Sequence, residues 1–161
     1  MMLQKKWKSF MRMSMEQKLL LVEAYLLLGW ARLLKLLPFS KVAPWLGAAM
    51  AETSHILSTE HEQTIRRVSK AIHKMSPYTW WESQCLVKAV AAMIMLHRRG
   101  VDSTLYLGTA KDEDGRLIAH AWLRSGAYYL TGANEMNKFI VVGKFAHTVP
   151  EQRGRRRHQH E

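Results

Sequence analysis

Cysteine is almost absent from this chain of 161 residues, which contains Cys85 alone. A single thiol excludes an internal disulfide framework and is typical of proteins that work in the reducing cytoplasm. It also excludes thiolate zinc clusters, and no His-x-x-x-His pair of the kind that binds a metal ion occurs in the sequence. We therefore expect a cytoplasmic protein that uses no metal ion or other cofactor.

Three further signals are missing. There is no glycine-rich phosphate loop, so nothing indicates nucleotide binding. The basic N-terminus is not followed by an apolar stretch and a small-residue cleavage site, which excludes a typical secretory signal. The leucine-rich segment from Leu19 to Leu37 contains Glu23, Arg32 and Lys35, so its apolar run falls short of the ~20 residues that cross a bilayer. We interpret it as a buried or interfacial amphipathic helix.

Acidic residues are scarce: 13 Asp and Glu face 24 Lys and Arg, for a formal net charge of +11. Part of the excess lies in an N-terminal cluster (Lys5, Lys6, Lys8 and Arg12) and in a cluster near the C-terminus (Arg153, Arg155, Arg156 and Arg157). We expect a basic arm over residues 1–15, one domain over 16–146 and a disordered basic tail over 147–161. A solvated tail explains this charge without a nucleic-acid partner.

The hydrophobic pattern changes along the chain from helical spacing to strand alternation. Apolar residues recur every three or four positions over 16–37 and 60–75, and the stretch after Cys85 is apolar over most of its surface until Gly100. A second short helix is predicted over 41–51, with Pro44 in its first turn. Strands are predicted over 103–109, 117–124, 127–131 and 139–142. Helices followed by an antiparallel meander indicate an α+β fold with a central helix that begins near Cys85.

Cys85 lies just inside the start of that central helix. Unpaired N–H groups and the helix dipole favour an anion there, so the position favours a nucleophilic thiolate. The same N–H groups are suited to stabilise an oxyanion, and Gln84 is a candidate for an additional donor. The alternative is a small buried cysteine with no chemical role, which is a common fate of free cysteine.

His120 is the candidate base for Cys85. It lies in a predicted strand whose alternation places Ile118, His120 and Trp122 on one face of the sheet. The alternative is a half-buried histidine that binds only a backbone carbonyl. A third residue should orient the imidazole, and Asn134 and Glu135 are the candidates just beyond the next strand, with Asn134 slightly preferred.

Tryptophans flank both candidate catalytic residues. Trp81 precedes Cys85 by four positions and Trp122 follows His120 by two. These side chains are candidates for the wall of a cleft that holds an apolar peptide side chain. An anchoring role under the helix start is an equally good interpretation of the Trp80–Trp81 pair.

The ordered motifs resemble the transglutaminase-like cysteine proteases, and more closely the leader peptidases of lasso-peptide biosynthesis. The matching stretches are Ala31-Arg32-Leu33-Leu34, Leu37-Pro38-Phe39, Cys85-Leu86, Leu96-His97-Arg98-Arg99-Gly100-Val101, Leu107-Gly108, His120-Ala121-Trp122-Leu123-Arg124 and Thr131-Gly132. The likeness spans roughly residues 16–145. It implies a papain-like or transglutaminase-like core in which Cys85 and His120 form the catalytic pair. The family commonly has an aspartate in the hairpin after His-Ala-Trp, whereas this chain has Ala127 in one candidate position and Asn134 or Glu135 later, so the third catalytic residue stays open.

The resemblance also implies a function and partners. Such peptidases remove the leader of a ribosomally made precursor peptide, and a macrocyclising synthetase then closes the ring. Because the amphipathic helix begins almost at once, we expect the split form, with a separate leader-recognition protein in place of a fused domain. Such a partner needs an apolar surface on which to dock. Candidate contributors to this surface are Trp7, Trp30, Trp45 and the Leu19–Leu37 helix, although packing in the core explains most of these residues.

A function of a different class is compatible with the same sequence. The net charge and the amphipathic first helix also fit a non-catalytic scaffold that binds an acidic partner or a membrane surface. A third alternative retains the enzyme and changes the acceptor from water to an amine, because both reactions pass through the same thioester.

Overall fold

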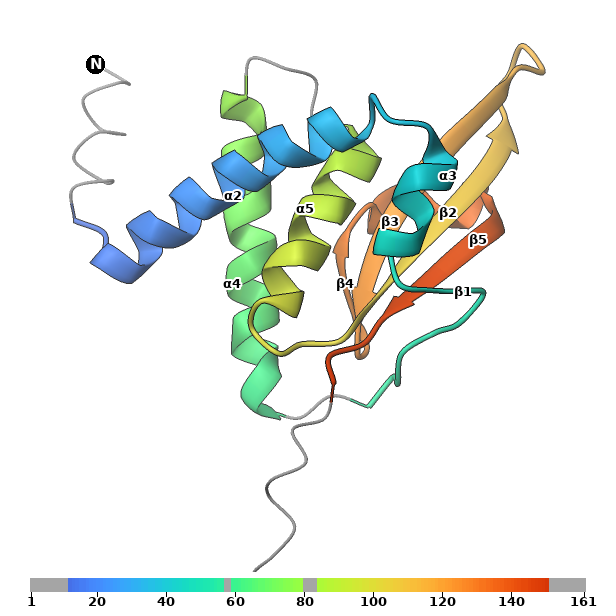
Figure 1. Ribbon diagram of the computed structural model, residues 1–161. Helices are drawn as coiled ribbons and strands as arrows, with labels where there is room; N and C mark the ends of the chain where they lie inside the picture. The colour runs from blue at the N-terminus through green and yellow to red at the C-terminus, as the bar shows by residue number, and fades with distance from the viewer. Residues whose placement is uncertain (1–11, 57–58, 80–83, 151–161) are drawn as a thin grey trace, which may run out of the picture.

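The fold is a layer of helices packed against one face of an antiparallel sheet (Figure 1). The computed structural model describes residues 12–56, 59–79 and 84–150. Among these residues no helix is long and apolar enough to cross a membrane. The expected N-terminal arm lies mostly outside the described residues, and so does most of the expected tail.

Three long helices form the layer: α2 (Met15–Leu34), α4 (Thr59–Met75) and α5 (Cys85–His97). Helix α2 begins with a capping box in which Ser14 and Gln17 each bind the other's backbone N–H. Eight of the 13 residues of α5 are buried, among them Val87 and Met95, so the prediction of a central helix is confirmed. The C-terminal half of the chain then supplies most of the sheet.

The sheet has five strands in the order β1-β5-β2-β3-β4, all antiparallel. Their bounds are β1 Ala48–Ala49, β2 Ser103–Lys111, β3 Leu117–Ser125, β4 Tyr128–Thr131 and β5 Ile140–His147. Strands β2, β3 and β4 form the expected meander, but β5 pairs with β2 on the far side from β3. The chain between β4 and β5 includes the 3₁₀ helix η3 (Ala133–Lys138).

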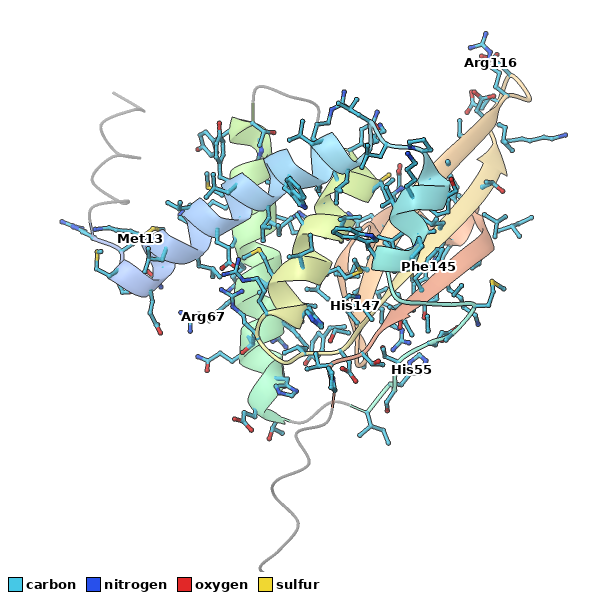
Figure 2. The ribbon with its side chains drawn as sticks, viewed as in Figure 1. Met13, His55, Arg67, Arg116, Phe145 and His147 are labelled. Carbon is cyan, nitrogen blue, oxygen red and sulfur yellow. The ribbon has the colours of Figure 1, made fainter. Side chains whose placement is uncertain are left out.

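The two faces of the sheet have different partners. Leu105, Leu107, Ala121 and Leu123 alternate onto the face that shares its hydrophobic core with α5. Phe145 and His147 of β5 point the same way, where Phe145 meets Phe39 and His147 meets His97 of α5 (Figure 2).

On the opposite face, Tyr106 pairs with Trp122 and Gly108 pairs with His120. The ring of Phe139, which follows η3, lies 4.9 Å from the ring of His120 on this face. The η3 connection therefore runs across the face opposite α5, which will be called the outer face.

The predicted helix over 41–51 is wrong. The chain instead forms a four-residue helix α3 (Phe39–Val42), a 3₁₀ turn η1 (Ala43–Trp45) and strand β1. The backbone keeps right-handed helical angles at Ala43 and Leu46 on either side of Pro44, so the proline does not end the helical geometry. Gly47 then takes a φ of 115° that passes the chain close to the backbone of Ala146, so that β1 pairs with β5.

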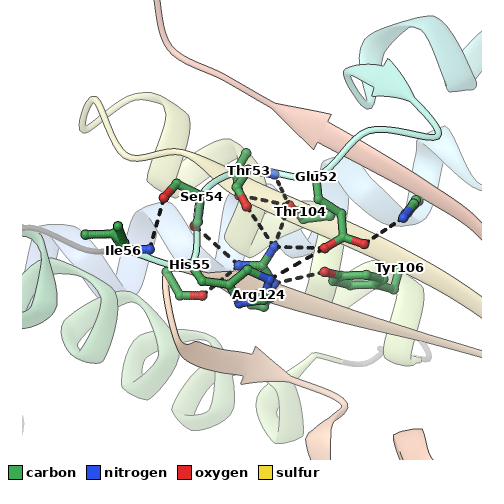
Figure 3. A network of polar contacts seen from close by, with 10 residues as sticks. Glu52, Thr53, Ser54, His55, Ile56, Thr104, Tyr106 and Arg124 are labelled. Atoms are coloured by element: carbon green, nitrogen blue, oxygen red, sulfur yellow. Dashed lines mark hydrogen bonds and ion pairs between the residues drawn. The ribbon is translucent and has the colours of Figure 1, made fainter.

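Residues after β1 are fixed to the outer face by Arg124, which is fully buried (Figure 3). Its guanidinium donates to the carbonyl oxygens of Thr53 and Gly126 and to the hydroxyl of Tyr106 at 2.7–2.9 Å. Glu52 lies 3.5 Å away and also accepts from Lys144. The Lys144 hydrogen bond holds the pKa of Glu52 below its ordinary value.

Candidate active site

Cys85 is the first residue of α5, as the sequence predicts. Gln84 is the N-cap residue in extended geometry, and its carbonyl accepts the first helical hydrogen bond from Lys88. Cys85 is half-buried and packs against the hydrophobic core on the helix side of the sheet. Its position at the start of the helix places it beside the backbone N–H groups of the first turn, which are suited to bind an oxyanion.

The side chain of Gln84, the candidate oxyanion donor, contacts the end of α2. Its amide oxygen accepts a hydrogen bond from the ammonium group of Lys35, just after α2. This contact ties the start of α5 to the end of α2. Trp81, the other candidate before the nucleophile, lies outside the described residues.

His120 lies in β3, and its ring packs between two aromatic side chains. The ring centroids of Trp122 and Phe139 are 5.9 Å and 4.9 Å from that of His120. Gly108 lies opposite His120 on β2, and a Cβ there would lie 2.8 Å from both Trp122 and Phe139. The missing side chain of Gly108 therefore makes room for the aromatic rings beside His120. Trp122 is buried and its ring stacks beside that of His120. Its side chain does not line the pocket that His120 lines.

The imidazole of His120 is oriented by a backbone carbonyl. Its Nε2 lies 2.9 Å from the carbonyl oxygen of Gly132. A carbonyl oxygen only accepts, so Nε2 is the protonated nitrogen and Nδ1 is the basic one. The sequence offered Thr131-Gly132 as a matched motif but gave no signal for this hydrogen bond.

Asn134 and Glu135 both lie in η3, beside the ring of His120. Neither is hydrogen-bonded to it, and the carboxylate of Glu135 lies 3.8 Å from the ammonium group of Lys138. Both residues line the same pocket as His120. The role of either side chain as the third catalytic residue stays a prediction.

That pocket has a volume of about 450 Å³ and lies at the open edge of β3. Strand β4 pairs with β3 only from Leu123 onward, so the edge beside His120 has no paired strand, although Gly132 lies close to it. Ser69 and His73 of α4 line one side of the pocket, and the residues from Tyr129 to Glu135 line the other. The pocket therefore joins the helix side of the sheet to the outer face around this edge.

The thiol and the imidazole lie on different sides of the sheet. Strand alternation places His120 on the outer face, whereas Cys85 packs on the helix side, and no hydrogen bond joins them among the described residues. Both belong to packed neighbouring elements, because α5 lies directly against β3. The pairing of Cys85 with His120 therefore stays a prediction.

No metal centre accompanies these residues in the described part of the chain, where no group of three or more His, Cys, Asp or Glu side chains is placed to hold an ion. His73, which the sequence did not single out, is the second imidazole of the pocket. Its Nε2 lies 2.9 Å from the carbonyl oxygen of Leu130 in β4.

In a comparison with protein-family models, residues 27–143 match the model of the transglutaminase-like superfamily. Comparisons with curated proteins and with solved structures give no match. The matched region contains Cys85, the His-Ala-Trp strand and the whole pocket. It also covers well over half of the chain. The chain therefore belongs to the transglutaminase-like superfamily.

Proposed function

We propose that this protein is a cysteine peptidase that removes the leader from a ribosomally made lasso-peptide precursor. The observation that carries the proposal is the placement of Cys85 as the first residue of α5, against the strand that carries His120, inside the region that matches the superfamily. The ordered motifs of the leader peptidases supply the substrate class.

The reaction assigns one step to each group. The proton of the Cys85 thiol passes to Nδ1 of His120, and the thiolate attacks the carbonyl carbon of the scissile peptide. Backbone N–H groups at the start of α5 stabilise the oxyanion. The imidazolium then protonates the leaving amine, which is the N-terminus of the core peptide. Water, deprotonated by His120, hydrolyses the thioester and releases the leader as a carboxylate.

This reaction requires Nδ1 of His120 and the thiol of Cys85 to approach each other around the unpaired edge of β3, while Nε2 keeps its hydrogen bond to the Gly132 carbonyl. We assign the space for this approach and for the substrate to the pocket that His120 lines, although Cys85 is not among its lining residues. Peptide bound there would lie between α4 and the η3 segment, with Asn134 and Glu135 beside it.

The proposal includes two partners, a separate leader-recognition protein and a macrocyclising synthetase. All three proteins would act in the cytoplasm. The leader-recognition protein delivers the precursor, and the synthetase uses the freed amine.

The test is to incubate the protein, the products of neighbouring genes and the precursor, and to follow leader release by mass spectrometry. We expect a leader with a C-terminal carboxylate from the native protein and none from Cys85→Ala. His55→Ala, which removes an exposed imidazole remote from the pocket, is the control and should cleave normally. Release by Cys85→Ala at the native rate would overturn the proposal, and a leader joined to an amine would indicate acyl transfer.

A further inference from the structure

Strand β4 ends in a bulge beside the pocket. Its pairing partners on β3 advance by one residue while β4 itself advances by two, from Tyr129 to Thr131, so Leu130 between them is the extra residue of the bulge. Gly132 follows with a left-handed backbone and begins η3. A bulge disrupts the ladder locally, so the buried carbonyl of its extra residue requires donors from another part of the protein.

Two side chains of α4 supply these donors. The hydroxyl of Ser69 and Nε2 of His73 each lie 2.9 Å from the carbonyl oxygen of Leu130. The two residues are four positions apart and therefore lie on one face of the helix. Because the carbonyl can only accept, Nε2 of His73 carries the proton. Leu130 is buried, so water is a poor substitute for either donor.

The same short segment holds the imidazole on the outer face of the sheet. Two residues after Leu130, the carbonyl oxygen of Gly132 lies 2.9 Å from Nε2 of His120. Gly132 fits tightly, since an added Cβ would lie 2.5 Å from the carbonyl oxygen of Ala121. A displacement of the Leu130 carbonyl is therefore transmitted to the Gly132 carbonyl. Both imidazoles also line the same pocket.

A separate contact between α4 and β4 lies away from the pocket. Tyr128 donates to the carboxylate of Glu62 at 2.6 Å and accepts from Arg66 at 3.1 Å. Neither Glu62 nor Arg66 lines the pocket. This contact holds the start of β4 on α4 without His73, so the loss of the His73 hydrogen bond should change the bulge and leave the strand docked.

We propose that His73 is a positioning residue of the peptidase, which together with Ser69 holds the bulge at Leu130 and thereby orients His120. The inference rests on the proposed function for its effect on activity, whereas the orientation of His120 can be measured without any substrate. The reaction needs Nδ1 of His120 as the base. An imidazole without a fixed partner for Nε2 also populates the other tautomer, in which Nδ1 carries the proton and cannot accept one.

The first test reads the tautomer of His120 from the nitrogen NMR shifts of its ring, in the full chain at about pH 8, where an ordinary imidazole is neutral. We expect protonated Nε2 in the native protein and a mixture of both tautomers in His73→Leu. His73→Gln keeps an N–H donor and should retain the native signal. Ser69→Ala, a smaller change at the same carbonyl, should give an intermediate mixture and provides the answer if His73→Leu does not fold.

The control for this measurement is His61→Leu, which removes another imidazole of α4 that does not line the pocket. It should leave the His120 signal unchanged. Protonated Nε2 alone in both His73→Leu and Ser69→Ala would overturn the proposal.

The second test measures leader release at matched folded fraction. We expect His73→Leu to lower kcat about tenfold or more with little change in KM, and His73→Gln to remain within about threefold of the native kcat. Native kcat in folded His73→Leu would contradict the positioning role and leave the proposed function intact. A native protein that releases no leader, but whose His120 tautomer depends on His73, would support the positioning role and contradict the proposed function.

Discussion

Gly132 controls the orientation of His120 through its backbone. Its φ is 72°, and a Cβ at this position would lie 2.5 Å from the carbonyl oxygen of Ala121 and 3.0 Å from Nε2 of His120. Glycine is thus required both by the left-handed backbone and by the close approach to the imidazole.

We predict that Gly132→Ala lowers peptidase activity at least tenfold, because the added methyl group displaces the carbonyl that holds Nε2 of His120. The matched control is Gly115→Ala, which has a similar φ of 78° and no atom within 4 Å of an added Cβ. Both variants should lose about 1–2 kcal/mol of stability from backbone strain. Equal activity in the two variants, measured by leader release at matched folded fraction, would contradict this role of Gly132.

Arg124 is the second residue whose removal should have a large effect. Arg124→Met leaves the carbonyl oxygens of Thr53 and Gly126 buried without their donor. We expect a loss of about 3 kcal/mol or more in the free energy of unfolding, measured by urea denaturation. Arg116→Met, at an arginine whose side chain is 77% exposed, should change stability by less than about 0.5 kcal/mol. A small effect at Arg124 would show that the network is dispensable.

The positions of Cys85 and His120 could be predicted because each depends on local pattern, a helix start and a strand. The partners of their side chains could not. The contact of His120 with the Gly132 carbonyl and the contacts of Arg124 with residues some 70 positions away depend on how distant segments meet. Residue type and spacing carry little information about such contacts.

At the scale of elements, long periodic segments were predicted well and short ones were not. The helices over 16–37 and 60–75 correspond to α2 and α4, and three of the four predicted strands lie close to β2, β3 and β4. The fourth strand, predicted over 139–142, corresponds to the start of β5. Strand β5 continues to His147, because β1 and β2 both pair with its second half. These pairings are tertiary and leave no period in the sequence.

The contact between β5 and α5 predicts a pH effect. Burial is the main cause that lowers the pKa of His147 below its ordinary value, and the neighbouring His97, 4.3 Å away between ring centroids, lowers it further, whereas Asp102 opposes the shift. The unfolded chain therefore binds more protons than the folded one as the pH falls below about 6.5. Stability should decrease as the pH falls through that value.

His147→Asn should reduce this part of the pH dependence, since the variant has no group to titrate at that position. The measurement is the free energy of unfolding of both proteins by urea between pH 7.5 and about 5.5. The carboxylates with lowered pKa, Glu52 and Glu62, titrate below this window and should contribute equally to both proteins. Parallel curves for the two proteins would contradict the assignment to His147.

At the scale of the whole molecule, the α+β class followed from the change of period along the chain, and the superfamily match agrees with it. The arrangement of the layers could not be predicted from this change of period. The chain after β4 crosses the outer face before it returns as β5, and this crossing encloses His120 under η3 on the side of the sheet away from Cys85. The proposed activity would therefore depend on the unpaired edge of β3, where the pocket lies between α4 and His120.

The most direct test of the catalytic account is the rate at which iodoacetamide alkylates Cys85 at pH 7, followed by intact-protein mass spectrometry. Each added group reports on Cys85, since the chain has no other cysteine. If His120 accepts the thiol proton, His120→Ala should slow alkylation about tenfold or more, whereas His55→Ala should alkylate at the native rate. Alkylation of His120→Ala as fast as the native protein would contradict a catalytic pair formed by Cys85 and His120.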